Sequence, residues 1–524
     1  MKNYAYPLTF RAFVVGIVGL VIITLSSMYV ALRMGALPWP TVFVTVLSMA
    51  VLSRFRNSNL NEINCCHTLM SAGAMVSGGL AFTIPGLWIL DKSADLPISE
   101  VMVIAIVGAL LGTLFTSLIR KKLIEKEQLP YPMGVASYET LTSVDDSKSA
   151  VKLFSAMGFS SLFTFFRDFL SAIPQTLQVF PSFGPFQALS VWTSPMALGI
   201  GAMIGPVLAG VWFLGMVIGY YILVPIGSLF ASVDYLNALR NDLGIGLMVG
   251  TGVGVFLKAV LSILKKVGKG SAGFDKKNIL TILLPMLLSV VVLSLLTELT
   301  TLEALLMMPL LFLATYLSSM LTGQTGVNPM EVFAILVLLA LSAILSPSLG
   351  ASFLIAGVVA VSAGLAGDVM NDLKSGYLLK TRPSSQLLAE GIGGVVGAIV
   401  ATFALFVLKD TYGFGPGSEM AAPQAQAVAL MVSGLNSEAG FITGLLVGCL
   451  FSLLSLPAAT LGLGVYLPVH ISSIMGLGAL VAFLFERYSK DRNYQKKTLS
   501  LISSGFLGGE GITGVLIAIY MMLS

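Results

Sequence analysis

The sequence predicts an all-α polytopic membrane protein with roughly 14–17 transmembrane or re-entrant helices. The chain has 524 residues, of which 56% are hydrophobic and only 10% charged, and its mean hydropathy is +0.93. A soluble domain carries about 25% charged residues. Glycine, which is frequent in membrane helices, occurs 54 times. The apolar runs are continuous rather than alternating, which excludes a transmembrane β-barrel.

Twelve stretches are apolar enough, and long enough, to be predicted as membrane-spanning helices. They cover residues 10–32, 38–53, 63–90, 98–119, 206–225, 239–257, 279–297, 303–321, 386–408, 438–456, 469–485 and 500–523. Apolar pieces interrupted by Pro and Gly lie between them, at residues 131–142, 150–166, 168–190, 194–205, 331–345 and 349–366. Irregular backbone inside a membrane is tolerated only against protein or a water-filled cavity. We therefore expect these pieces, as full spans or half-helices, to form the functional core of the protein.

The net charge of +4 is small and says nothing of nucleic acid, but the positions of the basic residues predict an orientation. Basic residues are enriched in cytoplasmic loops. The clusters are Lys2–Arg11, Arg54–Arg56, Arg120–Lys126, Lys258–Lys277, Lys374–Arg382 and Arg487–Lys497. Placing them in the cytoplasm predicts a multi-pass protein of the cell membrane, with a cytoplasmic N-terminus and an external C-terminus.

Short sequence matches recur at a nearly constant offset, which predicts an internal duplication. Leu25-Ser-Ser-Met28 recurs as Leu317-Ser-Ser-Met320, and Ser71-Ala-Gly73 recurs 291 residues later as Ser362-Ala-Gly364. Pro132 and Pro423 have the same offset of 291. The predicted parts are a first repeat at 1–257, a basic linker with a connecting helix at 258–302, and a second repeat at 303–524.

Equivalent loops of the two copies carry opposite charge character. The basic loop Arg120–Lys126 corresponds to residues 411–417, and the basic residues 487–497 correspond to 226–236, both of them poor in Lys and Arg. The copies therefore are predicted to have inverted membrane orientations. Inverted repeats are typical of secondary transporters, in which substrate binds near the middle of the membrane where discontinuous helices meet.

Six motifs, spread in order over nearly the whole chain, resemble one family. They are Asn61-Glu-Ile-Asn64; Gly78-Gly79 to Phe82-Thr-Ile-Pro85; Leu129-Pro-Tyr-Pro-Met-Gly-Val-Ala136 with Glu139; Thr322-Gly-Gln-Thr-Gly-Val-Asn-Pro-Met-Glu331; Gly367-Asp368 with Asp372-Leu-Lys-Ser-Gly-Tyr377; and Gly508-Gly-Glu-Gly511. The chain is similar to the oligopeptide transporter (OPT) family with its Yellow Stripe-like branch. One departure is Met133, where family members commonly have Glu after Pro-Tyr-Pro.

The resemblance implies secondary uptake of small peptides or peptide-like metal chelates, driven by a transmembrane proton gradient. It implies no enzyme activity, no cofactor and no bound metal of the protein's own. The implied partners are the substrate and the lipid bilayer, and a homo-oligomer stays open. Uptake of metal chelates alone is the alternative within the same class.

Two predicted breaks supply the candidate substrate-binding residues. Pro130 and Pro132 would make 131–142 a short helix whose N-terminal amides suit a substrate carboxylate. A second break runs from Gly323 to Pro329. The candidates at the two breaks are Tyr131, Ser137, Glu139, Gln324 and Asn328. The alternative interpretation is an ordinary loop at the membrane interface in each case.

Four acidic residues are candidates for proton coupling, because a carboxylate within a membrane usually has a function. They are Glu331, which is preferred, and Glu62, Asp368 and Glu510. Glu62 could instead cap a helix near Arg54, and Glu510 could be a packed interface residue. Asp368 and Asp372, four residues apart on one helix face, could pair with Lys374 at the cytoplasmic rim.

Other classes match the sequence less well. An intramembrane aspartyl protease needs Gly-x-Gly-Asp, whereas the chain has Gly364-Leu-Ala-Gly-Asp368, and a rhomboid serine would be Ser352 with His470. A passive channel should show a charged or carbonyl-rich filter repeated by symmetry, and none is visible. Cys65-Cys66-His67 has metal-ligand residue types, but adjacent helical side chains diverge and do not close a site alone.

Overall fold

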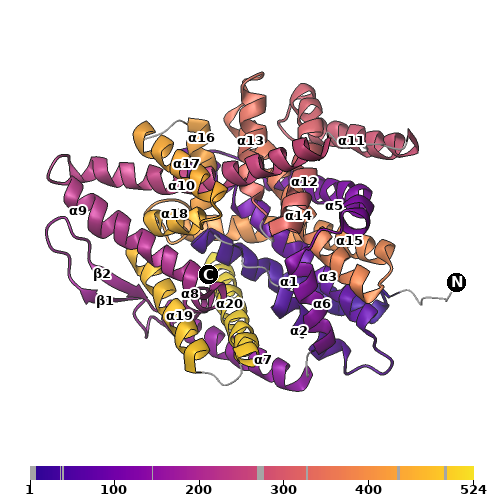
Figure 1. The fold of residues 1–524 in the computed structure, drawn as a ribbon, viewed down its shortest axis with the longest axis horizontal. Coiled ribbons are helices and arrows are strands. Elements are labelled where there is room, and N and C mark those ends of the chain that lie inside the picture. Colours follow the sequence, from indigo (N-terminus) through magenta and orange to yellow (C-terminus); the bar gives the residue numbers. More distant parts are fainter. Residues whose placement is uncertain are drawn as a thin grey trace. The chain divides into compact units, whose positions relative to one another are not determined.

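The computed structural model describes residues 7–35, 37, 41–143, 146–267, 276–325, 328–433, 437–488 and 492–523. Helices dominate these residues (Figure 1). The chain forms two compact units. Unit 1 contains Met1–Ala31, Trp39–Ser147 and Leu257–Asp410, and unit 2 contains Leu32–Pro38, Lys148–Phe256 and Thr411–Ser524.

Unit 1 is built from helices alone in its described part. They are α1 (Phe10–Met34, as far as Ala31), α2 (Thr41–Leu52), α3 (Leu60–Ala81), α4 (Pro85–Leu90), α5 (Ile98–Arg120), the π-helix η1 (Lys121–Lys126), α6 (Pro132–Ser143), α11 (Lys276–Leu296), α12 (Thr301–Thr325), α13 (Met330–Ser342), α14 (Leu349–Leu379) and α15 (Pro383–Tyr412, as far as Asp410).

Unit 2 combines helices with one β-hairpin. Its elements are α7 (Asp146–Thr164), η2 (Phe165–Phe169), β1 (Thr176–Phe180), β2 (Leu189–Trp192), α8 (Pro195–Met216), η3 (Val217–Leu223), α9 (Val224–Gly227), α10 (Val233–Val267, as far as Phe256), α16 (Pro423–Ser433), α17 (Glu438–Leu453), α18 (Ala458–Tyr466), α19 (Val469–Tyr488) and α20 (Arg492–Leu523).

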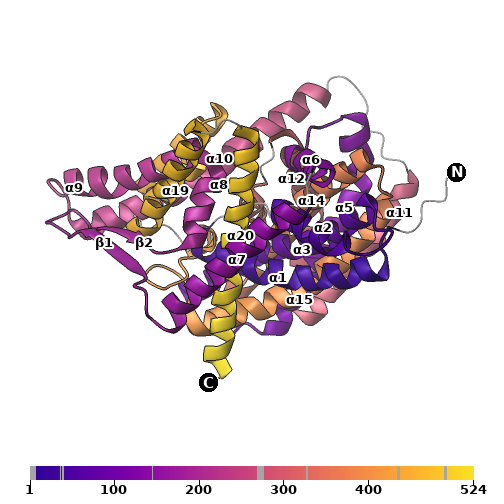
Figure 2. The same ribbon diagram turned by 90° about the horizontal axis from the view of Figure 1, so that it is seen from below.

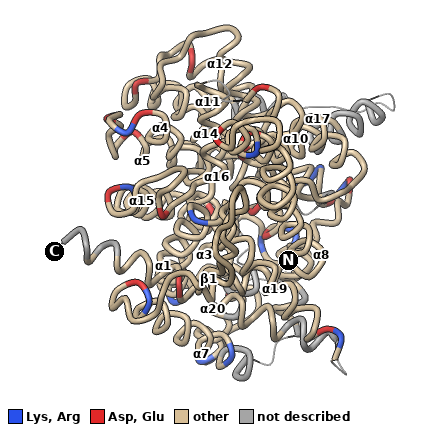
Figure 3. Tube along the Cα trace, turned by 90° about the vertical axis from the view of Figure 1, so that its left-hand side faces the viewer, with Lys and Arg blue, Asp and Glu red and all other residues tan. Residues whose placement is uncertain are grey.

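Within the described ranges, nine helical segments are long and apolar enough to cross a membrane. They are Phe10–Met34, Leu60–Leu90, Ile98–Lys126, Pro195–Gly227, Thr301–Gly323, Leu349–Leu379, Pro383–Tyr412, Val469–Tyr488 and Thr498–Ile517. Three shorter apolar helices accompany them, at Leu283–Leu296, Met330–Ser342 and Glu438–Leu453. Charged residues are sparse along the trace (Figure 3). The predicted all-α polytopic membrane class is confirmed.

Helix α14 forms the core of unit 1. Every residue from Ala351 to Gly376 is buried, including the charged Asp368, Asp372 and Lys374. It packs against α3, α5, α6, α12 and α13. The prediction of a broken piece ending at residue 366 was wrong, because α14 continues to Leu379. The small residues around Gly364 and Gly367 allow close helix packing instead of breaking the helix.

The principal helix of unit 2 is α8, which packs against α18, α19 and α20 (Figure 2). Ser194 caps its N-terminus by accepting a hydrogen bond from Ala197 N. Gly205 has a φ of 88°, and Pro206 follows, so the helix kinks there. The separate predicted pieces 194–205 and 206–225 are therefore two halves of one kinked element.

The prediction of a helical piece at 168–190 was wrong for most of that range. β1 and β2 form an antiparallel hairpin, with Thr176 opposite Trp192. Pro174, Pro181 and Pro185 disfavour a helix here, since each lacks a backbone donor. The strand Thr176–Phe180 also alternates polar and apolar residues, a pattern of period two that the overall hydropathy had obscured.

The element boundaries repeat at the offset seen in the sequence. Helices α1 and α12 both have 25 residues, and they begin 291 residues apart, at Phe10 and Thr301. Helices α6 and α16 begin at Pro132 and Pro423, also 291 apart. These matches support the internal duplication. The repeat boundaries and the inverted orientation stay predictions, while each compact unit takes segments from both predicted copies.

Glycines let helices α3 and α15 approach closely, which gives a test of the packing. A Cβ added at Gly397 would lie 2.6 Å from the Cα of Gly73. Overpacking of this kind costs about 1–3 kcal/mol, so Gly397→Ala should lower the stability measured by denaturant unfolding in detergent. Gly391→Ala on the same helix is the matched control, because no described atom would lie within 4 Å of its Cβ. Equal stabilities of the two variants would contradict the packing described here.

Candidate functional site

Four titratable side chains meet in the buried core of unit 1. His67 comes from α3, Asp368 and Asp372 from α14, and Glu390 from α15. Their exposures are 1%, 4%, 3% and 0%, respectively. Asp368 and Asp372 share one face of α14 because they are four residues apart. One carboxylate oxygen from each acidic residue lies within 4.8 Å of those of the other two.

The four groups differ in their hydrogen bonding. Asp372 Oδ2 accepts a hydrogen bond from Ser71 Oγ at 3.1 Å and lies 3.5 Å from His67 Nδ1. Glu390 has no hydrogen-bond partner for either carboxylate oxygen among the described residues, and Asp368 has none for Oδ2. The cluster therefore contains both a positioned carboxylate and two carboxylates with unused hydrogen-bonding capacity.

Polar side chains of the same helices support this cluster. Gln386 Nε2 donates to the backbone oxygen of Asp372 at 2.7 Å and to Thr68 Oγ1 at 3.2 Å. Further along α14, Ser375 Oγ donates to Asn64 Oδ1 at 3.2 Å. These bonds fix α14 and α15 against α3, and so they hold the acidic residues of α14 opposite His67.

The electrostatics of the cluster limit the charge that it can carry. Three ionised carboxylates at this separation, in a medium of low dielectric, repel one another strongly and lose their hydration. His67 can neutralise at most one of them. The arrangement can therefore hold one or more protons, or a hard cation bound by carboxylate oxygens. Loss or gain of a proton, or of a bound metal cation, would change the charge at the centre of unit 1.

The structure corrects the expected position of Asp372 and adds Glu390. Asp372 is buried beside His67, and it does not pair with Lys374, whose Nζ donates to the Leu129 backbone oxygen at 2.9 Å. Glu390 was missed by the sequence analysis. The signal was present, because Glu390 is the single charge in the apolar run 386–408, where a carboxylate is rare without a function.

The predicted break between 323 and 329 is present, since α12 ends at Thr325 and α13 begins at Met330. Asn328 ties this break to α14. Its Nδ2 donates to the backbone oxygens of Ala363 and Gly364 at 2.9 and 3.0 Å, and its Oδ1 accepts from Ser318 Oγ at 2.8 Å. The amide group of Asn328 is thus occupied in this conformation.

Tyr131 joins the Pro-Tyr-Pro segment to α12. Its N–H donates to Gly323 O at 2.9 Å and its hydroxyl donates to Ser319 O at 3.0 Å. Tyr131 is fully buried, and it adopts a φ of 46°, in the left-handed region. The predicted short helix is α6, which begins at Pro132. The two predicted breaks of this unit therefore contact each other directly.

The remaining candidates near these breaks have different surroundings. Ser137 is buried, and its hydroxyl has no partner within the described part of the chain. Glu331 lies half-buried in the first turn of α13. Glu139 and Gln324 lie in α6 and α12, but their side chains fall outside the described residues.

Glu62 is buried in the first turn of α3 and forms an ion pair with Arg11 of α1. Arg11 Nε and Nη2 donate to its two carboxylate oxygens at 2.6 and 2.7 Å, and Thr9 Oγ1 donates to it as well. The residue that caps the N-terminus of α3 is Asn59, whose side chain accepts a hydrogen bond from Glu62 N. Glu62 itself is therefore not the cap, and its carboxylate pairs with Arg11 instead. Bidentate bonding of this kind fixes the start of α3 against α1.

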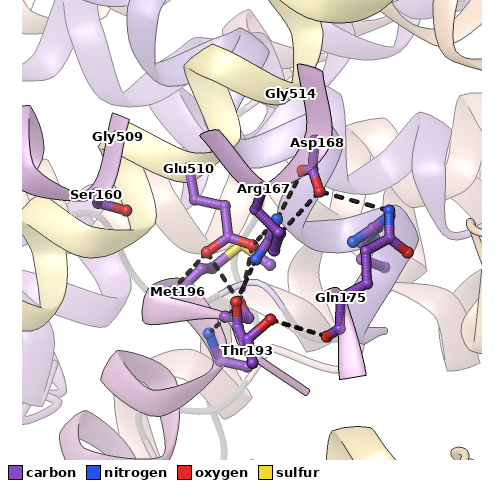
Figure 4. A network of polar contacts seen from close by, with 12 residues as sticks. Ser160, Arg167, Asp168, Gln175, Thr193, Met196, Gly509, Glu510 and Gly514 are labelled. Carbon is purple, nitrogen blue, oxygen red and sulfur yellow. Dashed lines mark hydrogen bonds and ion pairs between the residues drawn. The ribbon is translucent and has the colours of Figure 1, made fainter. Parts of the chain in front are cut away.

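Glu510 lies at the centre of a polar network in unit 2 (Figure 4). Its carboxylate accepts hydrogen bonds from Arg167 Nη2, Ser194 Oγ and Met196 N, each at 2.9 Å. Arg167 and Glu510 are both completely buried. Arg167 also donates to both carboxylate oxygens of Asp168 at 2.7 Å. The network joins η2, the N-terminus of α8 and α20, as the packed-interface alternative anticipates.

Known proteins are similar to this chain over most of its length. The family model described as OPT oligopeptide transporter protein matches residues 7–272 and 275–521. A Haemophilus influenzae protein named as an oligopeptide transporter is 25% identical, covering 95% of this chain and 93% of its own. A rice protein named as metal-nicotianamine transporter YSL5 is 23% identical, covering 79% of this chain and 74% of its own.

A shorter match points to the same branch. Arabidopsis thaliana metal-nicotianamine transporter YSL2 is 38% identical over 14% of this chain and 10% of its own length. The family model spans nearly the whole chain and includes both compact units. The chain therefore belongs to the OPT family of oligopeptide transporters, and it is a multi-pass membrane transporter and not an enzyme.

Proposed function

We propose that the protein is a secondary active transporter that couples uptake of small peptides, or of peptide-like metal chelates, to entry of protons. The substrates named for its relatives, oligopeptides and metal-nicotianamine complexes, support this substrate range. Both carry amines and carboxylates. The driving force is the proton gradient across the cell membrane, and the N-terminus is proposed to be cytoplasmic.

The observation that carries the coupling proposal is the buried cluster of His67, Asp368, Asp372 and Glu390. Its three carboxylates lie within 4.8 Å of one another in the buried core of unit 1, a separation at which full ionisation is unfavourable. A proton taken up on one side would reduce the negative charge of the cluster by one, and its release on the other side would restore that charge. Asp368 and Glu390 have the unsatisfied oxygens that such a proton needs.

Alternating access is the proposed mechanism. The two predicted repeats would rearrange so that the substrate site opens to the two sides of the membrane in turn, and the discontinuous segments 129–141 and 322–331 of unit 1 are proposed to move in this cycle. Protonation of the cluster lowers the cost of burying it, so it should favour the loaded conformation that turns toward the cytoplasm. Tyr131 is hydrogen-bonded to α12 and Asn328 to α14, and we propose that these hydrogen bonds break and re-form during the cycle.

Uptake by proteoliposomes under an imposed pH gradient tests this function. Trialanine and the iron–nicotianamine complex should be supplied separately, as peptide and chelate substrates. We expect accumulation of at least one of them when the outside is acidic, and loss of accumulation when a protonophore is added. Accumulation driven by a sodium gradient at equal pH, and not by the pH gradient, would contradict proton coupling.

Glu331 is the second proposed proton-coupling residue, and it needs its own variant. If Glu331 carries the proton, then Glu331→Gln should abolish accumulation driven by the pH gradient while leaving exchange of internal for external substrate. Wild-type accumulation with unchanged pH dependence in Glu331→Gln would remove this residue from the mechanism and leave the four-residue cluster as the proposed site.

A further inference from the structure

Unit 2 contains a cavity of about 440 Å³. Its volume lies in the range of about 300–1,000 Å³ that is usual for small-molecule sites. Among the residues that line it are the cationic Arg33 and Arg240, the aromatic Tyr220 and Tyr466, and His470. Glu419 is the acidic residue of its described lining. The walls therefore combine aromatic faces with an excess of positive charge.

Arg33 has a carboxylate partner in this cavity. Its Nη2 donates to Glu419 at 2.7 Å, and its guanidinium lies 4.8 Å from the centre of the Trp192 ring. The buried Arg167 elsewhere in unit 2 is also paired with carboxylates, Asp168 and Glu510. Buried guanidinium groups of unit 2 are thus ordinarily neutralised by a protein carboxylate.

Arg240 departs from this pattern. Only 6% of it is exposed, and it forms no ion pair with a described residue. Its Nη2 donates to Asn241 Oδ1 at 2.8 Å, and the guanidinium lies 3.7 Å from the centre of the Tyr220 ring. Nε and Nη1 are buried and have no hydrogen-bond partner in the described part of the chain.

A buried guanidinium with unused donors is unfavourable unless an anion compensates it. A carboxylate suits these donors, because its two oxygens match the planar fork of an arginine. The Tyr220 ring covers one face of the guanidinium and leaves its edge for hydrogen bonding. Aromatic neighbours also lower the local dielectric and strengthen such an ion pair.

We propose that the cavity is a carboxylate-binding site in which Arg240 binds a carboxylate of the transported molecule. This inference rests on the proposed transport function, since both small peptides and aminocarboxylate chelators carry that group. Nε and Nη1 are buried in this conformation, so the proposal requires a movement of the Arg240 side chain that brings one of them to the ligand. The proton-coupling cluster of unit 1 is a separate site with a separate role.

Binding to the purified full-length protein in detergent, without any gradient, tests the inference. Trialanine, trialaninamide and the iron–nicotianamine complex are compared by calorimetric titration. If the site takes the C-terminal carboxylate of a peptide, trialanine should bind at least about tenfold more tightly than its amide. If it takes a chelator carboxylate, the iron–nicotianamine complex should bind and trialanine should not.

Arg240→Gln should weaken binding of the preferred ligand by about tenfold or more and abolish the preference of the site for the acid over the amide. Arg240→Lys should retain part of the affinity, because it keeps the charge but loses the fork. Arg487→Gln is the matched control. Arg487 is exposed on α19 and lies 5.8 Å from the centre of the Phe483 ring, outside the cavity lining.

The inference is overturned if trialanine and its amide bind equally and the chelate does not bind, if no ligand binds wild type, or if Arg240→Gln binds like wild type. Should Arg240→Gln fail to fold, the binding of trialanine and trialaninamide to wild type still tests whether the site takes a peptide carboxylate. For the chelate, the test is whether the iron–nicotianamine complex protects Arg240 of the wild-type protein from modification by phenylglyoxal. If Arg240→Gln takes up substrate under a pH gradient with the same kinetics as wild type, the carboxylate-binding site is contradicted, whereas the transport function is not.

Discussion

Glu390→Gln should abolish proton-driven accumulation of substrate while leaving the protein folded. Glu390 is completely buried and has no hydrogen-bond partner among the described residues, so its amide isostere removes a proton-binding group with little change of shape. A gradient of one pH unit supports about tenfold accumulation for each coupled proton, since about 1.4 kcal/mol corresponds to a factor of ten. The variant should accumulate substrate to a ratio of about one.

Glu438→Gln serves as the control for this prediction, because it makes the same chemical change at an exposed position in α17. Exchange of labelled internal substrate for unlabelled external substrate should persist in both variants, since exchange needs no net proton movement. Undiminished gradient-driven accumulation in Glu390→Gln would exclude Glu390 from proton coupling. Loss of exchange as well would indicate a defect in substrate binding or folding.

Glu510→Ala should destabilise the protein by about 3–5 kcal/mol, the usual cost of removing one partner from a buried ion pair. The change leaves Arg167, which is completely buried, without one of its two carboxylate partners, and it removes the acceptor of Ser194 Oγ and Met196 N. Unfolding by denaturant in detergent, followed by tryptophan fluorescence, measures the loss.

The control for Glu510→Ala is Glu125→Ala. Glu125 pairs with Arg120 at 2.7 Å, but its side chain is 34% exposed. Loss of such a pair costs about 1 kcal/mol or less. Similar stabilities of Glu510→Ala and Glu125→Ala would show that the network around Glu510 does not stabilise unit 2, and they would favour the predicted proton-coupling role of Glu510.

The apolar runs, and the Pro, Gly and charged residues that separate them, predicted most of the fold. Runs of about 20 apolar residues have few other stable structures in a membrane, so α1, α5 and α12 were predicted within a few residues. The hairpin of β1 and β2 was not predicted, because total hydropathy cannot distinguish a half-membrane helix from apolar strands. Similarly, the glycines of α14 were compatible with both a break and a close helix contact.

The site was predicted only in part because proximity across helices is a tertiary property. Asp368 and Asp372 were singled out, since a spacing of four is local information. Their meeting with His67 and Glu390 depends on how α3 and α15 pack against α14, which no local pattern specifies. For the same reason, Lys374 was a plausible partner of Asp372 in sequence, although its side chain reaches Leu129 instead.

The central claim is that protons enter together with substrate through the cluster of unit 1. The most direct test records the internal pH of proteoliposomes with a trapped fluorescent dye, when trialanine or the iron–nicotianamine complex is added outside at equal pH. With wild type, we expect the addition to acidify the interior, and with Glu390→Gln we expect no acidification. Substrate entry into wild-type proteoliposomes without internal acidification would contradict the claim.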